Sequence, residues 1–306
     1  MGFDAFEKRF IDLDSSLGAK SYDRPGGIED WIALTKAPSY TPYRHSREAW
    51  LAFLSSGWWM QAVASQRYQT IFELGSGSGE DVSALGKSFV GQPRPRLRLI
   101  DISKRALRYA YEEICGQTIL PADSLDILYI RADFTKHLDR ALSYAEAGSK
   151  MVCMLGGTFG NFKEDELLAH MCANLSVNDC FVVGTEFYQI SNGDTQADEI
   201  LLGEYSSEEH KTFCSNELRY TETMAAVDRS KLNITMAKQL SSIPDTRSIV
   251  TYYNGAQNPV IQSHRYDYGH FVKYFSEHNL ELVHAADASS NPFMKCIAFQ
   301  KRATPA

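Results

Sequence analysis

The sequence predicts an α/β protein in which a doubly wound, Rossmann-like parallel sheet is accompanied by a second, smaller lobe. Strand-like apolar runs alternate with helix-like segments five times between residues 70 and 187, a pattern typical of a parallel sheet built from β-α-β units. A glycine-rich turn follows the first of these runs, as in nucleotide-binding sheets. After residue 187 the alternation gives way to short strand-like runs separated by turn residues, which favours a separate lobe.

The periodicity of apolar residues predicts each element in order. Residues 27–64 have helical spacing interrupted by two prolines in "APSYTP", so a helix, a loop and a helix are expected there. The alternating strands and helices of the sheet follow at 70–74, 81–89, 97–103, 104–115, 127–134, 137–146, 150–157, 164–175 and 180–187. Later elements are a helical region at 194–225, short strands at 233–243, 247–254 and 259–266, a helix at 268–278 and strands at 280–286 and 293–300.

The change in the pattern of strands and helices after residue 187 divides the chain into two expected units. Residues 61–188 and 268–306 form the nucleotide-binding core, and residues 1–60 and 189–267 form a discontinuous second lobe. A ligand site is expected in the cleft between them, because such sites favour the junctions of domains.

Composition restricts the class of partner. With 306 residues, 44% hydrophobic and 23% charged, the chain can bury a sizeable core. The formal net charge of −7 argues against nucleic-acid binding, so a small molecule is the expected partner. No apolar run has the length of a membrane span, and the N-terminal residues lack the apolar core of a signal peptide. We therefore expect a cytoplasmic protein without membrane contact; the oligomeric state is not indicated.

Cysteine and histidine spacing gives no sign of a metal site. The six cysteines include no CxxC pair, and several lie in apolar stretches, so reduced core thiols are expected. The histidines and carboxylates lack the HxxxH or paired-carboxylate spacing that would specify a metal.

The turn after the first strand, "ELGSGSG", suggests a bound ligand. Gly75, Ser76 and Gly77 begin a G-x-G-x-G run that differs from the G-x-G-x-x-G of dinucleotide-binding turns. Glycines let a ligand approach the backbone closely. The preceding carboxylate, Glu73, would repel a pyrophosphate but could hold a cation. S-adenosylmethionine (SAM) brings an ammonium and a sulfonium to this place, so SAM is the expected cofactor.

Acidic residues at the ends of the next strands support a nucleoside-containing ligand. Asp101, followed by Ile102, ends the second strand and suits the ribose hydroxyls, while Asp133 and Phe134 follow the third strand and suit the amino group and ring of adenine. The carboxyl ends of parallel strands meet at one edge of a sheet, so these side chains should converge with the glycine turn. The alternative is that Asp133 caps a helix and Phe134 belongs to the core.

The segment after the fourth strand, "MLGGTFGNF", points to a family. Its small and polar residues Gly156, Thr158 and Asn161 suit a site shared by cofactor and substrate. Here the sequence resembles the histidine-specific SAM-dependent methyltransferase family, known from ergothioneine synthesis and from N-methylation in fungal ergot-alkaloid pathways, whose run is close to "FLGSTIGNF". The chain is also similar to the family at "LTKAPSYTPYRHSRE", "ELGSGSG", "ADFT" and "SHRYDYGHF", in family order from about residue 30 to 275.

The resemblance implies a class I methyltransferase core that binds SAM and a second lobe that receives the amine of the substrate. By motif position, Asn161 and Tyr205 would contact the reacting end of the substrate, and Ser263 would lie beside its side group. In "SYTPYR" the tyrosines Tyr40 and Tyr43 bracket two residues instead of standing side by side, so either can face the substrate.

Glu186 is a further candidate from the residues themselves. It ends the fifth strand in "GTEFY", at the same edge of the sheet. A carboxylate there could accept a proton from the substrate amine. A solvated or capping carboxylate is the alternative.

One departure from the family bears on the substrate. The family has a glutamate two residues before the serine of its S-Y-K-Y segment, and both residues are expected to hold an imidazole; this chain has Ile261 before Ser263. Losing that acceptor should weaken histidine recognition by roughly 1 to 3 kcal/mol. The sequence therefore predicts a biosynthetic SAM-dependent N-methyltransferase for another amino acid or small amine, aromatic ones included.

Three other functions stay open at this point. An O-methyltransferase acting on a small molecule would need the same cofactor site. An NAD(P)-dependent oxidoreductase would share the acidic residue at Asp101, and a non-catalytic SAM-binding protein would share the glycine turn. The number of methyl groups transferred is not indicated.

Overall fold

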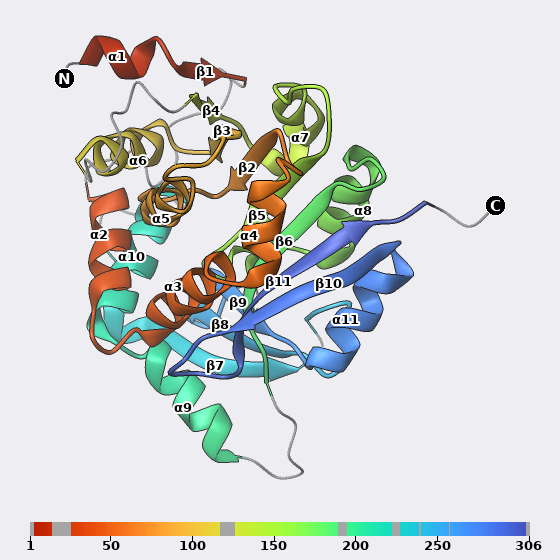
Figure 1. Ribbon diagram of the computed structural model, residues 1–306. Coiled ribbons are helices and arrows are strands. Elements are labelled where there is room, and N and C mark those ends of the chain that lie inside the picture. The colour runs from red at the N-terminus through yellow and green to blue at the C-terminus, as the bar shows by residue number, and fades with distance from the viewer. Residues whose placement is uncertain are drawn as a thin grey trace.

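A large, mostly parallel sheet forms the centre of the protein in the computed structural model, which describes residues 3–13, 26–116, 126–188, 195–221, 227–238, 240–256 and 258–303. Its eight strands have the order β1-β4-β3-β2-β5-β6-β11-β10 (Figure 1). The strands are Phe10–Asp12 (β1), Thr70–Leu74 (β2), Arg96–Asp101 (β3), Ile127–Arg131 (β4), Lys150–Met154 (β5), Cys180–Glu186 (β6), Leu280–Asp287 (β10) and Met294–Lys301 (β11).

The strand order confirms the doubly wound prediction. The chain passes from β2 outward through β3 to β4, then returns to the other side of β2 with β5 and β6, and all these neighbours pair in parallel. Strand β11 runs opposite to the other strands of this sheet and pairs antiparallel with β6 and β10. The reversal between β2 and β5 creates the crevice at which such sheets bind ligands.

Helices cover both faces of this sheet (Figure 1). One core cluster joins the sheet to α3, α4, α5 and α6, and the other joins its opposite face to α7, α8 and α11. Neighbouring residues of β2 divide between the two, Ile71 facing the first cluster and Phe72 the second, as strand geometry requires. The helices are α3 (Thr41–Leu54), α4 (Gly57–Ala64), α5 (Glu80–Ser88), α6 (Lys104–Gly116), α7 (Phe134–Leu142), α8 (Glu164–Asn174) and α11 (Tyr268–Glu277).

A smaller antiparallel sheet lies beside the carboxyl end of β6. It has the order β7-β8-β9, and a single bridge between Phe187 and Tyr266 connects it to the main sheet. Helix α9 packs on β7 and β8, and α10 packs along α2 (Figure 1). These elements are α2 (Gly27–Lys36), α9 (Thr195–Tyr205), α10 (Glu208–Thr221), β7 (Leu232–Lys238), β8 (Arg247–Tyr253) and β9 (Ile261–Arg265), with short 3-10 helices η3 (Thr158–Asn161) and η4 (Arg229–Lys231).

Most of the expected strands and helices are found, with shifts of a few residues at their ends. The second helix expected in 27–64 is divided into α3 and α4, and the helical region expected at 194–225 contains α9 and α10, with residues 194 and 222–225 outside the described ones. The strand expected at 233–243 ends at Lys238, and residue 239 also lies outside the described residues. Two short N-terminal elements, α1 (Phe3–Glu7) and β1, were not expected, because three to five residues are too few for a periodic pattern. Strand β1 pairs with β4, and α3 contacts β11 and β10, so parts of residues 1–60 lie on the main sheet. The boundaries of the two lobes therefore stay a prediction.

Two further observations concern the state of the cysteines and the length of the helices. The six cysteines are free, and four of them are buried. None of the helices in the described ranges has the length and apolar character needed to cross a membrane.

Gly79 shows that one glycine of the turn has a packing role. It stands at the N-terminus of α5 with φ +77°, and a Cβ on it would lie 2.7 Å from the Cα of Ala110 on α6. Both the positive φ and the close approach of α6 therefore require glycine here.

Replacing Gly79 with alanine should lower the free energy of unfolding by about 2 to 4 kcal/mol, since it combines a left-handed backbone with overpacking. Urea denaturation measures the change. Gly203→Ala is the matched control, because Gly203 is exposed within α9 and has open space around it; there stability should stay the same or rise. Equal effects of the two substitutions would contradict the packing role.

Candidate active site

A cavity of about 280 Å³ lies at the carboxyl ends of the parallel strands. Helices α2, α3, α9 and α10 and strand β9 supply its other walls. Every site residue predicted from the sequence lines it: Tyr40, Tyr43, Glu73, Gly75, Ser76, Gly77, Asp101, Ile102, Asp133, Phe134, Gly156, Thr158, Asn161, Glu186, Tyr205 and Ser263. The residues at or after the ends of β2 to β6 converge because the carboxyl ends of parallel strands meet at one edge of the sheet, whereas Tyr40, Tyr43, Tyr205 and Ser263 come from α3 and its N-cap, α9 and β9. Their individual roles stay predictions.

The glycine turn is held against the second and fourth strands of the predicted series. The Gly77 amide donates to Asp101 Oδ2 at 3.2 Å, and the Ser103 amide donates to the other oxygen at 2.9 Å. A Cβ on Gly75 would lie 3.1 Å from Thr158 Cγ2. The turn therefore has bare backbone facing the segment that follows β5.

Three buried carboxylates surround this turn: Glu73, Asp81 and Asp101. Burial raises the pKa of Glu73 well above its usual value, and the charges of Asp81 and Asp101 add to the effect. Burial also raises the pKa of Asp81 to about 6, although Arg47 opposes the shift. In the described structure, Ser76 Oγ and Asp81 Oδ1 are buried without a hydrogen-bond partner. This end of the cavity thus suits a positively charged ligand.

Asp133 and Phe134, the two residues expected at the adenine, also have contacts within the protein. Asp133 is the N-cap of α7 and accepts hydrogen bonds from the amide and hydroxyl of Thr135, at 3.2 and 2.6 Å. Partial burial opposes a low pKa for Asp133, but the hydrogen bonds from Thr135 and Lys136 lower it. Phe134 is buried and packs edge-to-face on Phe162. The capping and core contacts of the alternative interpretation are therefore present, while both residues also line the cavity.

Strand β9 forms the wall at the opposite end. Ile261, Ser263 and Arg265 alternate along it and all line the cavity, as side chains on one face of a strand do. Arg265 is buried, and its Nη1 donates to Ser263 Oγ at 2.9 Å while its Nη2 donates to the Tyr205 hydroxyl at 2.7 Å. One guanidinium therefore orients two of the predicted substrate-side hydroxyls.

Glu186 is the charge partner of this arginine. Arg265 Nε donates to Glu186 Oε2 at 2.6 Å, and Asn291 Nδ2 donates to Oε1 at 2.8 Å. Burial by itself would lower the pKa of Arg265, yet its neighbours Tyr205 and Glu186 raise it. Both carboxylate oxygens of Glu186 are therefore engaged in hydrogen bonds with neighbouring side chains. Its predicted catalytic role stays a prediction.

The two tyrosines of "SYTPYR" occupy different parts of the cavity. The ring of Tyr40 packs edge-to-face on Tyr205, with centroids 5.5 Å apart. Tyr43 instead lies against Trp31 at 5.6 Å. Burial raises the pKa of Tyr43, and the charge of Asp81 adds to it. Tyr40 is thus the tyrosine beside the arginine, and Tyr43 is the one beside the glycine turn.

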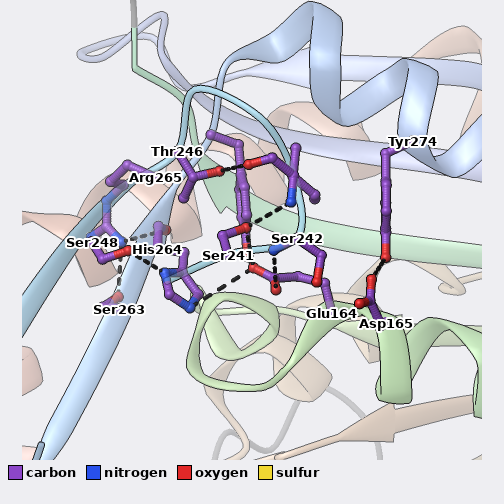
Figure 2. Close-up of polar contacts among 12 residues, drawn as sticks. Glu164, Asp165, Ser241, Ser242, Thr246, Ser248, Ser263, His264, Arg265 and Tyr274 are labelled. Atoms are coloured by element: carbon purple, nitrogen blue, oxygen red, sulfur yellow. Dashed lines mark hydrogen bonds and ion pairs between the residues drawn. The ribbon is translucent and has the colours of Figure 1, made fainter. Parts of the chain in front are cut away.

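A polar network behind β9 fixes the wall in place (Figure 2). Glu164, at the start of α8, accepts hydrogen bonds from the Ser241 hydroxyl at 2.7 Å and the Tyr266 hydroxyl at 3.0 Å. His264 Nδ1 lies 2.7 Å from Ser248 Oγ. A Cβ on Gly160 would lie 2.9 Å from the His264 carbonyl oxygen. The strand and η3, which carries the exposed Asn161, are therefore packed backbone to backbone.

A family model described as "Histidine-specific methyltransferase, SAM-dependent" matches residues 16–230. The chain belongs to the histidine-specific SAM-dependent methyltransferase family. It is therefore an enzyme that uses SAM as its cofactor. No curated protein sequence matches the chain.

Solved structures similar to this family member are class I SAM methyltransferases. Magnesium protoporphyrin IX methyltransferase from Synechocystis PCC 6803, with bound S-adenosylhomocysteine, has a TM-score of 0.51 and 10% identity over 92% of this chain and 98% of that chain. The 1,6-didemethyltoxoflavin-N1-methyltransferase from Burkholderia thailandensis has a TM-score of 0.43 and 8% identity over 90% and 91% of the two chains. At these identities the first likeness supports the fold alone.

The residues of this methyltransferase fit SAM at the acidic end of the cavity. Glu73 is a buried carboxylate that could hold the ammonium group. Asp101 would take the ribose hydroxyls, with Asp133 and Phe134 at the adenine. Among the residues described, no group of three or more histidine, cysteine or acidic side chains is placed to hold a metal ion.

Sequence reasoning missed several residues of the family member's cavity. The missed residues include Arg265, Asp81, His210, Phe213 and Trp31. A signal existed for Arg265, because it stands two residues after Ser263 in a strand and must share its face. Burial lowers the pKa of His210 to about 4, so it is neutral near pH 7, a property that only its surroundings reveal.

Replacing Glu186 with glutamine should lower the free energy of unfolding by about 3 to 5 kcal/mol, because Arg265 would be left buried without a counter-charge. Urea denaturation at neutral pH measures this. The control is Glu166→Gln, since Glu166 pairs with Lys163 on the surface, where both side chains are about three-quarters exposed; it should cost under about 1 kcal/mol. A similar loss of stability in both variants would show that the buried ion pair does not stabilise the fold.

Proposed function

We propose that this enzyme methylates the nitrogen of an amino acid or small amine whose side group is less polar than imidazole, an aromatic group fitting best. The observation that supports it is Ile261 in the cavity wall, two residues before Ser263 on the same face of β9. An isoleucine cannot accept a hydrogen bond from an imidazole N–H. The expected cytoplasmic location belongs to the same proposal, because it rests on composition alone.

The surroundings of Ile261 fit an apolar or aromatic side group. The rings of Tyr40, Tyr205 and Phe213 line the cavity with it. Aromatic walls favour flat apolar groups and exclude water. A substrate side group placed here would meet one hydroxyl, that of Ser263, which is already oriented by Arg265.

The chemistry requires an uncharged amine. SAM supplies a methyl group on a positively charged sulfur, and an amine can accept it only through a free lone pair. The amide oxygen of Asn161 and the hydroxyl oxygen of Tyr205 are acceptors for the remaining N–H groups and would aim that lone pair. Arg265 donates to the Tyr205 hydroxyl, so the orientation of this oxygen is set before a substrate arrives. Glu186 keeps the arginine charge balanced.

Incubating the protein with SAM and a panel of amines tests the proposal. The panel contains histidine, tryptophan, tyrosine and several phenolic or heteroaromatic amines, and mass spectrometry follows both methylation and S-adenosylhomocysteine release. We expect one or more methyl groups on the nitrogen of an aromatic amine and little on histidine. Methylation confined to oxygen, or efficient methylation of histidine, would overturn the proposal.

Substituting Ile261 with glutamate should convert the preference. A carboxylate beside Ser263 restores an imidazole acceptor worth roughly 1 to 3 kcal/mol, so kcat/KM for histidine should rise about tenfold while that for the preferred amine falls. Ile261→Leu keeps an apolar side chain of equal size and serves as the control. If the leucine variant gains histidine activity to the same extent, the effect comes from cavity shape and the proposed role of position 261 is wrong.

A further inference from the structure

Asp81 is a cavity carboxylate that the proposed reaction does not use. It lies in the first turn of α5, is 8% exposed and lines the cavity with Glu73. Its Oδ1 is buried without a hydrogen-bond partner in the described structure, as is the neighbouring Ser76 Oγ. An unsatisfied buried carboxylate oxygen is costly, so an outside group that can donate a hydrogen bond would complete it.

The charges that face Asp81 leave a negative excess. Glu73 on β2 and Asp101 on β3 form a buried acidic group with it. Glu80, on its own helix, forms an ion pair with Arg47 of α3, and that arginine is 41% exposed. Tyr43, Cys153 and Cys296 also face this group, and burial raises the pKa of each, so they are neutral near pH 7.

The arginine in the described cavity wall, Arg265, forms its ion pair away from the acidic end. Among the described residues that line the cavity, Arg265 is the one lysine or arginine, and it is paired with Glu186 at the substrate end. The acidic end is therefore not neutralised from within the described wall. Two adjacent buried carboxylates without a cation cannot both be ionised at low cost, so the Glu73 and Asp81 pair retains a proton below about pH 6, the value to which burial raises the pKa of Asp81.

We propose that Asp81 is a second carboxylate for the ammonium group of SAM, shared with Glu73, and that the pair releases a proton when the cofactor binds. The ammonium donates to both side chains and supplies the missing positive charge. The proton leaves to solvent, so charge is balanced before and after binding. This inference concerns cofactor binding alone, and its outcome does not depend on the methyl acceptor.

The sign of the pH dependence follows from linkage. In the free protein, burial raises the pKa of Glu73, and it raises that of Asp81 to about 6. A bound cation lowers both values, so protons leave on binding and affinity increases with pH. Affinity should rise with pH through the range around pH 6 in which Asp81 loses its proton in the free protein.

Calorimetric titration with S-adenosylhomocysteine in buffers of different ionisation enthalpy counts the released protons without turnover. At pH 6 we expect about one proton for the wild type. 5′-Methylthioadenosine, which lacks the ammonium and carboxylate, should release none. An equal count for both ligands would overturn the proposal, and this comparison needs no variant.

Variants assign the effect to Asp81. In Asp81→Asn the number of protons released on binding should fall towards zero. The Kd for S-adenosylhomocysteine at pH 7 should rise about tenfold, because one hydrogen bond to a charged group is lost. Asp81→Ser serves the same purpose if the asparagine variant is unstable. Glu166→Gln is the control, because Glu166 is an exposed carboxylate paired with Lys163 and does not line the cavity; its count should equal that of the wild type. An unchanged count in the Asp81 variants would exclude Asp81.

Discussion

The buried ion pair between Arg265 and Glu186 is the interaction on which the substrate end of the cavity depends. Arg265 belongs to the three-stranded sheet and Glu186 ends a strand of the eight-stranded sheet. A guanidinium removed from water needs a carboxylate at hydrogen-bonding distance, so the two sheets have to meet at this point. Their meeting also brings the hydroxyls of Tyr205 and Ser263 to the guanidinium, and the cavity wall is assembled as a consequence.

The two ends of the cavity handle charge in different ways. At the substrate end, the arginine is balanced by Glu186 and the remaining wall is largely aromatic and apolar. At the cofactor end, Glu73 and Asp81 are buried beside Asp101, and burial raises the pKa of both Glu73 and Asp81. A cavity built in this way suits a cation at its acidic end, and under the function proposed above its other end receives an uncharged amine.

Much of the fold and many of the cavity residues could be predicted from local pattern. The parallel strands have buried runs of characteristic length, and Glu73 and Asp101 could be identified because their place is defined by the strand they end. Strand β1 escaped detection because its three residues are too few to show a period. Asp81 escaped because a charged residue in a helix usually faces water, and nothing local marks it as buried. Arg265 was missed although its place two residues after Ser263 puts it on the same face of a strand.

The sequence by itself determined the doubly wound sheet, the SAM cofactor and the membership of the family, since periodicity and short motifs depend on neighbouring residues. Only the tertiary structure decided which charges are buried together. Glu186 and Arg265 are 79 residues apart in the chain, and the same residue types would be ordinary surface charges if the small sheet packed elsewhere. Desolvation gives them their properties, and desolvation is a consequence of how the whole chain packs.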